Sequence, residues 1–465
     1  MIRNAMRRGA LTFALALAPV ATKAETLADA LASAYTHSGL LQQNRALLRA
    51  ADEDVAVAVA ALRPIVSWSS SFSRDFGYSY SATAGAGTGF QDDSASFSIV
   101  AELLLYDFGA SRLQVDAAKE AVLATREGLV VIEQQVLLRA VVAYVGVRSA
   151  SETVSLRQNN LRLVQQELRA ARDRFEVGEV TRTDVSLAEA RLAASRANLA
   201  AAEGDLLRAI EEYRATVGSG PDNLVAVTRL PDVERNEDAA KAIAVRTHPS
   251  MRQAQYQVST ADINLRRAEA AVKPQVSLSG RVTKSGDFNS GDYSNTGSVS
   301  VDFGGPIYRG GQLSALERQA KARADAARSN LHVVQLGVAQ DVGTALATLR
   351  VANASIEATE RQIRAARVAF QGVREEATLG QRTTLDVLTA EQDLLDAEVA
   401  YTAAVADRTI AAYQVLSAMG LMTAKHLGLN VQLYDPAEYY RLIRNAPVKS
   451  LQGDKLDRVL RRIGD

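Results

Sequence analysis

Two stretches of this chain, RFEVGEVTRTDVSLAEARL at residues 174–192 and EATLGQRTTLDVLTAEQDL at residues 376–394, follow one pattern. In each, a Gly is followed by a Thr, an Asp and then an apolar run at the same spacing. The matching pairs lie 202 residues apart, as from 178 to 380, and are Gly178/Gly380, Thr181/Thr383, Asp184/Asp386, Val185/Val387, Ala188/Ala390, Glu189/Glu391 and Leu192/Leu394. The Thr and Asp have capping-box spacing, which predicts a helix start after the Gly turn. Each stretch therefore indicates the tip of a helical hairpin.

The repeat extends outward from these tips. Residues 106–109 (YDFG) align with 308–311 (YRGG), and residues 63–64 (RP) align with 273–274 (KP). A repeat of this length is a duplicated domain and not a solenoid of short units. We interpret the chain as two structural copies, residues 25–220 and 237–425, joined by a linker at 221–236 and followed by a C-terminal tail at 426–465.

Long helices are predicted before each tip. Residues 109–177 and 311–378 contain no Pro and carry apolar residues at heptad spacing, a pattern typical of coiled-coil packing. Each helix would be about 100 Å long at 1.5 Å per residue. A second helix returns after each tip, and further helices are predicted at 40–62 and 250–272.

Each Pro is followed by a strand pattern. Apolar and small polar residues alternate in two predicted hairpins, 64–105 and 274–304, around polar loops at 81–92 and 286–296. Strands of about ten residues can cross a bilayer at a tilt. The predicted membrane-facing residues are Val66, Trp68, Phe72, Phe97, Ile99, Leu103, Val276, Leu278, Val282, Val299 and Val301. The alternative is a pair of small soluble hairpins that cap a helical bundle.

Four strands cannot close a membrane barrel, because open strand edges in lipid leave backbone groups unpaired. If the hairpins enter a membrane, several copies of the chain must complete the wall. Two copies would give eight strands, the minimum for a barrel, and three would give twelve with room for a lumen. The strand pattern therefore predicts a homo-oligomer.

The composition excludes several function classes. Among the 465 residues, 53 are Lys or Arg and 53 are Asp or Glu, so the basic surplus of a general nucleic-acid binder is lacking. There are no Cys, and the four His stand far apart without metal-ligand spacing. His37 and His248, which correspond across the repeat, are interpreted as surface or helix-start residues. We expect no enzyme activity, no cofactor and no metal site.

The first residues, MIRNAMRRGALTFALALAPVATKA, have a basic start, a short apolar run and a small-residue exit. This order is typical of a secretory signal peptide, and we predict that residues 1–24 are removed after Ala24. The alternative is a buried N-terminal helix. The rest of the sequence has no run of eighteen apolar residues, so we expect no transmembrane helix.

These features together resemble the TolC-type outer membrane channels. The resemblance covers about residues 25–435 and is most specific at PIYRGG (306–311) and LGQRTTLDVLTAEQDLLDAE (379–398). It implies a mostly α-helical fold with a membrane β-barrel, in a homotrimer. Four strands per chain would complete a twelve-stranded barrel in the outer membrane, and the duplicated coiled-coil hairpins would form an α-barrel tunnel through the periplasm. The implied partners are outer membrane lipid, a periplasmic adaptor (membrane fusion protein) and an inner-membrane transporter, with no nucleic acid.

The resemblance also implies a gate at the hairpin tips. Asp386 stands where an acidic ring is expected, and Arg382 matches a gating Arg. Thr183 and Asp184 match the partners of that Arg in the first copy. Thr389 departs from the pattern, because the strongest family members carry a second Asp there, so the ring at that level would be neutral. The alternative interpretation is that both Asp only cap helices and that Arg382 is a solvated charge.

The resemblance implies the function of a passive outer membrane exit duct in a tripartite export system. It also implies that the adaptor docks at the hairpin tips, which contain Gly178 and Gly380. Type I protein secretion is predicted, because the tail GLNVQLYDPAEYYRLIRNAPVKS (428–450) resembles the tails of such channels. Multidrug or metal efflux is the alternative. A periplasmic coiled-coil adaptor should have one hairpin and not two, and a secreted enzyme would need a clustered catalytic set that the sequence lacks.

Overall fold

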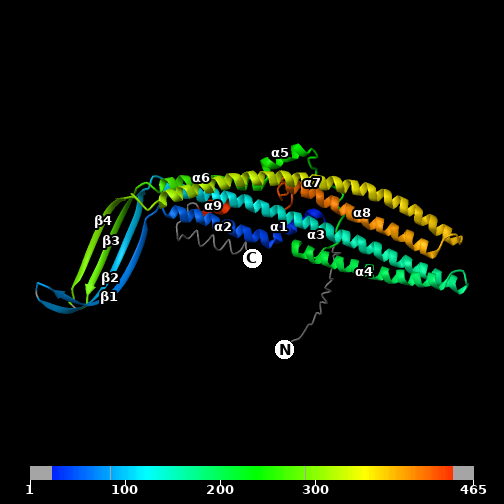
Figure 1. The fold of residues 1–465 in the computed structure, drawn as a ribbon, viewed down its shortest axis with the longest axis horizontal. Helices are drawn as coiled ribbons and strands as arrows, with labels where there is room; N and C mark the ends of the chain where they lie inside the picture. The colour runs from blue at the N-terminus through cyan, green and yellow to red at the C-terminus, as the bar shows by residue number, and fades with distance from the viewer. Residues whose placement is uncertain (1–23, 84, 289, 444–465) are drawn as a thin grey trace, which may run out of the picture.

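The computed structural model describes residues 24–83, 85–288 and 290–443. The predicted signal peptide lies outside the described residues except for Ala24, and so does the tail from residue 444 onward. The molecule is elongated, with a sheet at one end and long helices that extend away from it (Figure 1). Within the described part, the same order of elements occurs twice: two helices, a strand hairpin, a very long helix and a returning helix.

The first set consists of α1 (Leu27–His37), α2 (Gly39–Ala60), β1 (Ile65–Ser81), β2 (Ala86–Tyr106), α3 (Ala110–Glu176) and α4 (Arg182–Val217). The second set consists of α5 (Glu237–Thr247), α6 (Pro249–Ala270), β3 (Gln275–Asp287), β4 (Tyr293–Gly304), α7 (Gln312–Thr378) and α8 (Thr384–Ala418), and a short α9 (Glu438–Ile443) follows. The predicted helices at 40–62 and 250–272 correspond to α2 and α6. The structure adds α1, α5 and α9, which the sequence patterns did not indicate.

The helices α3 and α7 have 67 residues each and are the longest elements that the structure describes. Near the sheet they lie beside α2 and α6, and in the far half beside α4 and α8 (Figure 1). One 18-residue window of α3 has a mean hydropathy of 1.6. Half of that window is buried inside the protein, and α3 packs against α1, α2, α4, α6 and α8. We therefore interpret it as a core helix.

Two buried tyrosines, one on α3 and one on α4, form hydrogen bonds with the start of the described chain and with the linker between the two copies. The Tyr144 hydroxyl donates to the Glu25 carbonyl at 3.0 Å and to the Val225 carbonyl at 2.7 Å. The Tyr213 hydroxyl donates to the Glu25 carboxylate at 2.6 Å. Buried hydroxyls need such partners, so these bonds hold α3, α4 and the linker in one place.

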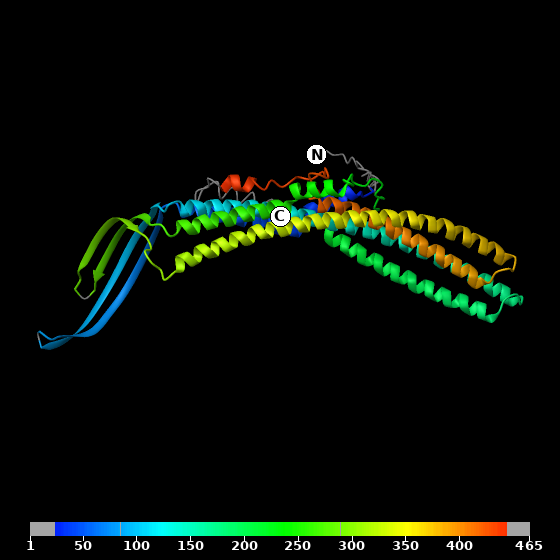
Figure 2. The same cartoon turned by 45° about the horizontal axis from the view of Figure 1, so that its top comes forward.

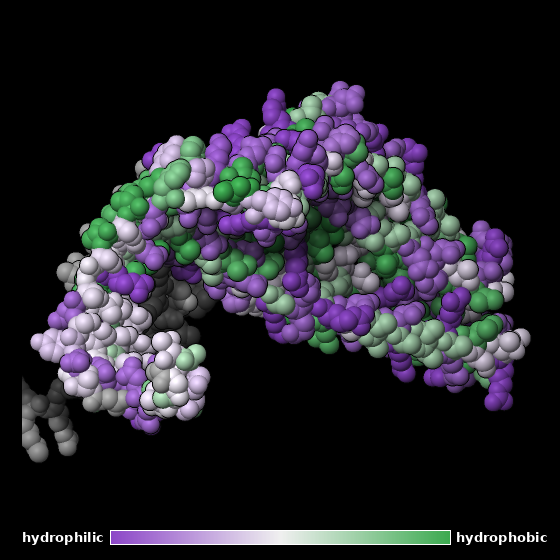
Figure 3. Space-filling view, turned by 60° about the vertical axis from the view of Figure 1, so that its left-hand side comes forward, coloured by the Kyte–Doolittle hydropathy of each residue, from purple (hydrophilic) through white to green (hydrophobic). Residues whose placement is uncertain are grey.

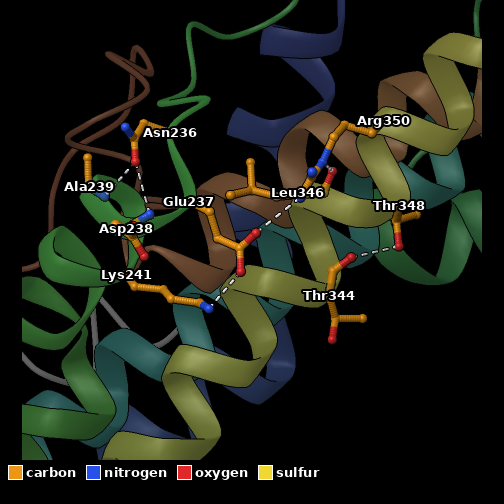
Figure 4. A network of polar contacts seen from close by, with 9 residues as sticks. All are labelled: Asn236, Glu237, Asp238, Ala239, Lys241, Thr344, Leu346, Thr348 and Arg350. Atoms are coloured by element: carbon orange, nitrogen blue, oxygen red, sulfur yellow. Dashed lines mark hydrogen bonds and ion pairs between the residues drawn. The ribbon is translucent and has the colours of Figure 1, made fainter.

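The helix α5 packs on α7 through buried alanines and through the carboxylate of Glu237. Glu237 accepts from Lys241 at 2.7 Å, one turn further along α5, and from Arg350 on α7 at 3.2 Å (Figure 4). Asn236 caps the helix by accepting from the Asp238 and Ala239 backbone amides. The second copy therefore carries its short helix on the outside of its long one.

The four strands form one antiparallel sheet in the order β1-β2-β3-β4, and the β2–β3 pair joins the two copies. The predicted length of about ten residues is wrong, because the strands have 17, 21, 13 and 12 residues. The predicted loop at 81–92 is also wrong beyond residue 85, since β2 begins at Ala86 and pairs with Ser81. The loop at 286–296 is likewise shorter. Ladder hydrogen bonds use only the backbone, so Gly and Ser continue them.

Candidate functional site

The predicted membrane residues all lie on one face of the sheet. The register pairs Trp68 with Ile99, Ile99 with Val282 and Leu278 with Val301, and residues two apart on a strand share a face. The set on this face is Val66, Trp68, Phe72, Phe97, Ile99, Leu103, Val276, Leu278, Val282, Val299 and Val301. Trp68 stacks on Phe97 with ring centroids 6.1 Å apart. The face is therefore a continuous apolar surface.

The opposite face is covered by hydroxyl groups. Ser71 and Ser96 are 2.8 Å apart across β1 and β2, and Ser98 and Thr283 are 2.8 Å apart across β2 and β3. Ser279 forms a similar pair with Ser300 at 2.7 Å. Figure 3 brings the sheet forward, and much of the surface over the strands is pale there, in keeping with these weakly polar residues. One face suits a lipid contact and the other suits water.

An ion pair interrupts the apolar face. Arg74 Nε lies 2.6 Å from Asp93 Oδ1, on the same face as Trp68 but further along β1. The part of β1 before Arg74, residues 65–73, matches the roughly 9–11 residues that a tilted strand needs to cross a bilayer. The extra length of β1 and β2 lies beyond this ion pair, and there the same face of β1 carries three exposed aromatic residues, Phe76, Tyr78 and Tyr80. The predicted span of about ten residues corresponds to the part of β1 that precedes the ion pair.

The two hairpin tips lie together at the end of the rod opposite the sheet (Figure 2). At the first tip, Gly178 has φ +80° and Glu179 N donates to the Arg174 carbonyl at 2.9 Å. At the second, Gly380 has φ +75° and Gln381 N donates to the Glu376 carbonyl at 3.0 Å. This positive-φ helix end favours glycine. Both predicted tip glycines occupy positions where the backbone requires them.

Both predicted aspartates cap the helices that return from the tips. The Asp184 carboxylate accepts from the Thr181 backbone amide at 2.9 Å, and the Asp386 carboxylate accepts from the Thr383 amide at 2.9 Å. Hydrogen bonds from the hydroxyl and the amide of Thr181 hold the pKa of Asp184 below the usual range. Those from the amide and the hydroxyl of Thr383 do the same for the pKa of Asp386. Both aspartates are therefore charged helix caps at the tips.

The remaining predicted gate residues are less tightly held. Arg382 Nε bonds Glu376 Oε2 of its own hairpin at 2.8 Å, and both side chains are about half exposed. Over the described parts of this single chain, Arg382 has no hydrogen bond or ion pair to Thr183 or Asp184. Thr389 is exposed and its hydroxyl donates to the Leu385 carbonyl at 2.9 Å. The gate role of these residues stays a prediction.

Removing a cap should loosen its tip. We expect that Asp386→Ala exposes the first turn of α8, because the Thr383 amide loses its acceptor. Limited proteolysis should show faster cleavage near residue 384, whereas Thr389→Ala should cleave like the wild type. Lowering the pH should also speed cleavage near residue 384 in the wild type. Since the pKa of Asp386 is lowered, the cap is retained above the ordinary range of Asp and is lost as the pH falls through the lowered value. Equal cleavage of Asp386→Ala and the wild type would contradict this.

One buried polar cluster was missed by the sequence analysis. Glu391 on α8 is 5% exposed. Its Oε1 accepts from Asn160 on α3 at 2.7 Å, and Asn160 in turn accepts from Ser195 on α4 at 2.8 Å. The cluster connects the two hairpins about two turns above the second tip. The only sequence signal was a set of polar residues on otherwise apolar faces.

The comparisons with known proteins decide the family. The family model described as "Outer membrane efflux protein" matches residues 30–219 and 243–421. The chain belongs to this family. It is 38% identical over 427 residues to "Outer membrane efflux protein BepC" of Brucella suis, covering 91% of this chain and 92% of that protein. It is 26% identical over 282 residues to "Alkaline protease secretion protein AprF" of Pseudomonas aeruginosa, covering 57% of each.

The structural comparison gives the same answer for the fold. The crystal structure of the Campylobacter jejuni CmeC outer membrane channel superposes with a TM-score of 0.76 at 16% identity, covering 90% of this chain and 89% of that one. Relatives named outer membrane protein TolC are also among the matches. The resemblance to TolC-type channels is confirmed. This efflux-family chain has the fold of an outer membrane channel, with the helical part in the periplasm.

Proposed function

We propose that three copies of this chain form a passive exit channel through the outer membrane and that the channel works with a periplasmic adaptor and an inner-membrane transporter. The observation that carries the proposal is the sheet itself. It has one apolar face, one hydroxyl-covered face and two outer strands, β1 and β4, each of which pairs with a strand on one side only in the described chain. Such edges are closed by further strands when a sheet enters lipid.

The exposed surface supports the same assembly. Trp68 is 72% exposed and Val299 is 80% exposed in the single chain, which is unfavourable in water for so many apolar side chains on one face. In a closed ring of sheets, this face would contact lipid and the serine face would line the lumen. A channel of this kind supplies no energy of its own, so the transporter must supply it.

We further propose that the exported substrate is a protein. The support is the likeness to AprF, a relative named for protease secretion, together with the tail segment around Tyr434. Export of small molecules is the second candidate, because BepC, the relative with 38% identity, is named an efflux protein. The mechanism is the same for both, namely a tunnel that opens at the tips when the partners dock.

The assembly and the substrate can be tested separately. For the assembly, detergent-purified protein should have the mass of a trimer and should give stable single-channel conductance in a planar bilayer. A soluble monomer that never inserts would overturn the channel. For the substrate, deletion of the gene should remove specific proteins from the culture medium without changing sensitivity to drugs. The opposite pattern would favour efflux and contradict protein secretion.

A further inference from the structure

The buried cluster between the hairpins is unusual because its central group can change charge. The Glu391 carboxyl belongs to the second hairpin and is connected to both helices of the first one, directly to Asn160 on α3 and through Asn160 to Ser195 on α4. Its second oxygen, Oε2, is buried and has no hydrogen-bond partner among the residues that the structure describes. An ionised carboxylate with one oxygen unpaired is costly to bury, whereas a protonated one is much less so.

The surroundings do not compensate that charge directly. Glu167 on α3 opposes ionisation of Glu391, while Arg191 on α4 and Arg374 on α7 favour it. Neither Arg forms an ion pair with Glu391 among the described contacts. Burial, first of all, raises the pKa of Glu391 to about 7, while the Asn160 hydrogen bond lowers it. The group is therefore close to half-protonated near neutral pH.

The internal repeat provides a comparison within the same chain. Glu189 occupies the matching position on α4, yet it is half exposed and pairs with Arg172 at 2.5 Å. Glu391, by contrast, lies where α8 of the second hairpin packs against α3 and α4 of the first. Leu388, one turn earlier, is buried among Val164, Leu168 and other residues of α3 and α4. Within a single chain, therefore, Glu391 lies between the two hairpins and Glu189 does not.

We propose that Glu391, Asn160 and Ser195 form a proton-dependent latch that holds the second hairpin against the first and keeps the tunnel closed while Glu391 is protonated. The proposal rests on the channel function proposed above. Opening requires the hairpins to separate at the tips, which breaks the Asn160–Glu391 bond and brings water to the carboxyl. Glu391 thus acts on the gate as a positioning residue.

The direction of the pH effect follows from the two states. In the closed state the pKa of Glu391 is about 7, and in the water-exposed open state it should return toward the ordinary value for Glu, roughly 4.3. A raised pKa means that the closed state gains stability at low pH and loses it as the pH rises through about 7. Acid should favour closure, and neutral to mildly alkaline conditions should favour opening.

The test measures opening against pH in full-length trimers. We expect the ratio of open to closed channels in a planar bilayer to rise roughly thirtyfold for each Glu391 between about pH 5.5 and about pH 8, because the pKa of Glu391 falls from about 7 in the closed state to roughly 4.3 in the open state. Glu391→Gln, which is neutral at every pH, should remove this dependence and stay closed. Glu189→Gln is the matched control and should keep the wild-type profile. Asn160→Ala should shift the midpoint upward, because it removes the bond that lowers the pKa of Glu391.

A second readout does not depend on conduction. The chain has no Cys, so Glu179→Cys with Gln381→Cys places spin labels at the two tips only. The distance distribution between the labels should broaden as the pH rises in the wild-type background and stay unchanged with Glu391→Gln. Absence of any conductance would count against the channel proposal. A pH profile or tip distance that is the same with and without Glu391→Gln would overturn the latch.

Discussion

Replacing Val299 with Arg should reduce the amount of folded, membrane-inserted protein by at least about tenfold. Val299 is 80% exposed in the single chain and lies on the apolar face of β4, opposite Gly280 of β3. If that face contacts lipid, a charge near the middle of the belt costs about 2–4 kcal/mol per chain. A trimer carries the substitution three times. The measurement is the yield of heat-modifiable trimer in isolated outer membranes.

The neighbouring residue supplies the control. Ser298 belongs to the same strand and pairs with Arg281, but alternation places it on the opposite, hydroxyl-covered face. Ser298→Arg should therefore insert at nearly the wild-type level, because its side chain would point into a water-filled lumen. A narrowed lumen should instead reduce its conductance. Equal loss in both variants would indicate that neither face contacts lipid and would favour a soluble hairpin.

Much of the fold could be predicted because the sequence contains an internal repeat, so that each pattern occurs twice. A constant offset between the two tips fixed the repeat, and the lack of Pro fixed the long helices. The period-2 alternation assigned the correct residues to one face of the sheet. The helices α1 and α5 escaped notice because each is only 11 residues long. The capping box of Thr26 and Asp29 was a usable signal for α1.

The site could be predicted only where local geometry determines it. The roles of Gly178 and Gly380 could be predicted from the turn, and those of Asp184 and Asp386 from the capping-box spacing. The burial of a side chain such as Glu391 could not be predicted in this way. Glu189 and Glu391 align perfectly in the repeat, yet one is exposed and the other is enclosed by three helices. That difference arises from how the two hairpins pack on each other, which the pattern of residues along the sequence does not show.

The second large effect is expected at the tips. Gly178→Val combined with Gly380→Val should reduce export at least about tenfold while leaving the trimer inserted in the outer membrane. A residue other than Gly at such a positive φ costs roughly 1–2 kcal/mol, and a β-branched residue is the worst case. Neighbouring atoms play no part, because a Cβ at either glycine would have nothing within 4 Å. The strain would instead rearrange the turn that we propose the adaptor contacts.

The choice of replacement separates backbone shape from side-chain bulk. Asn tolerates the left-handed region, so Gly178→Asn with Gly380→Asn should keep both turns and retain most of the export. Secreted substrate, trimer yield and cross-linking to the adaptor should be measured on the same cultures. If the Asn pair fails as badly as the Val pair, the adaptor requires a bare backbone at the tips. If the Val pair exports normally, the tips are not the docking surface, and the adaptor must contact the helices above them.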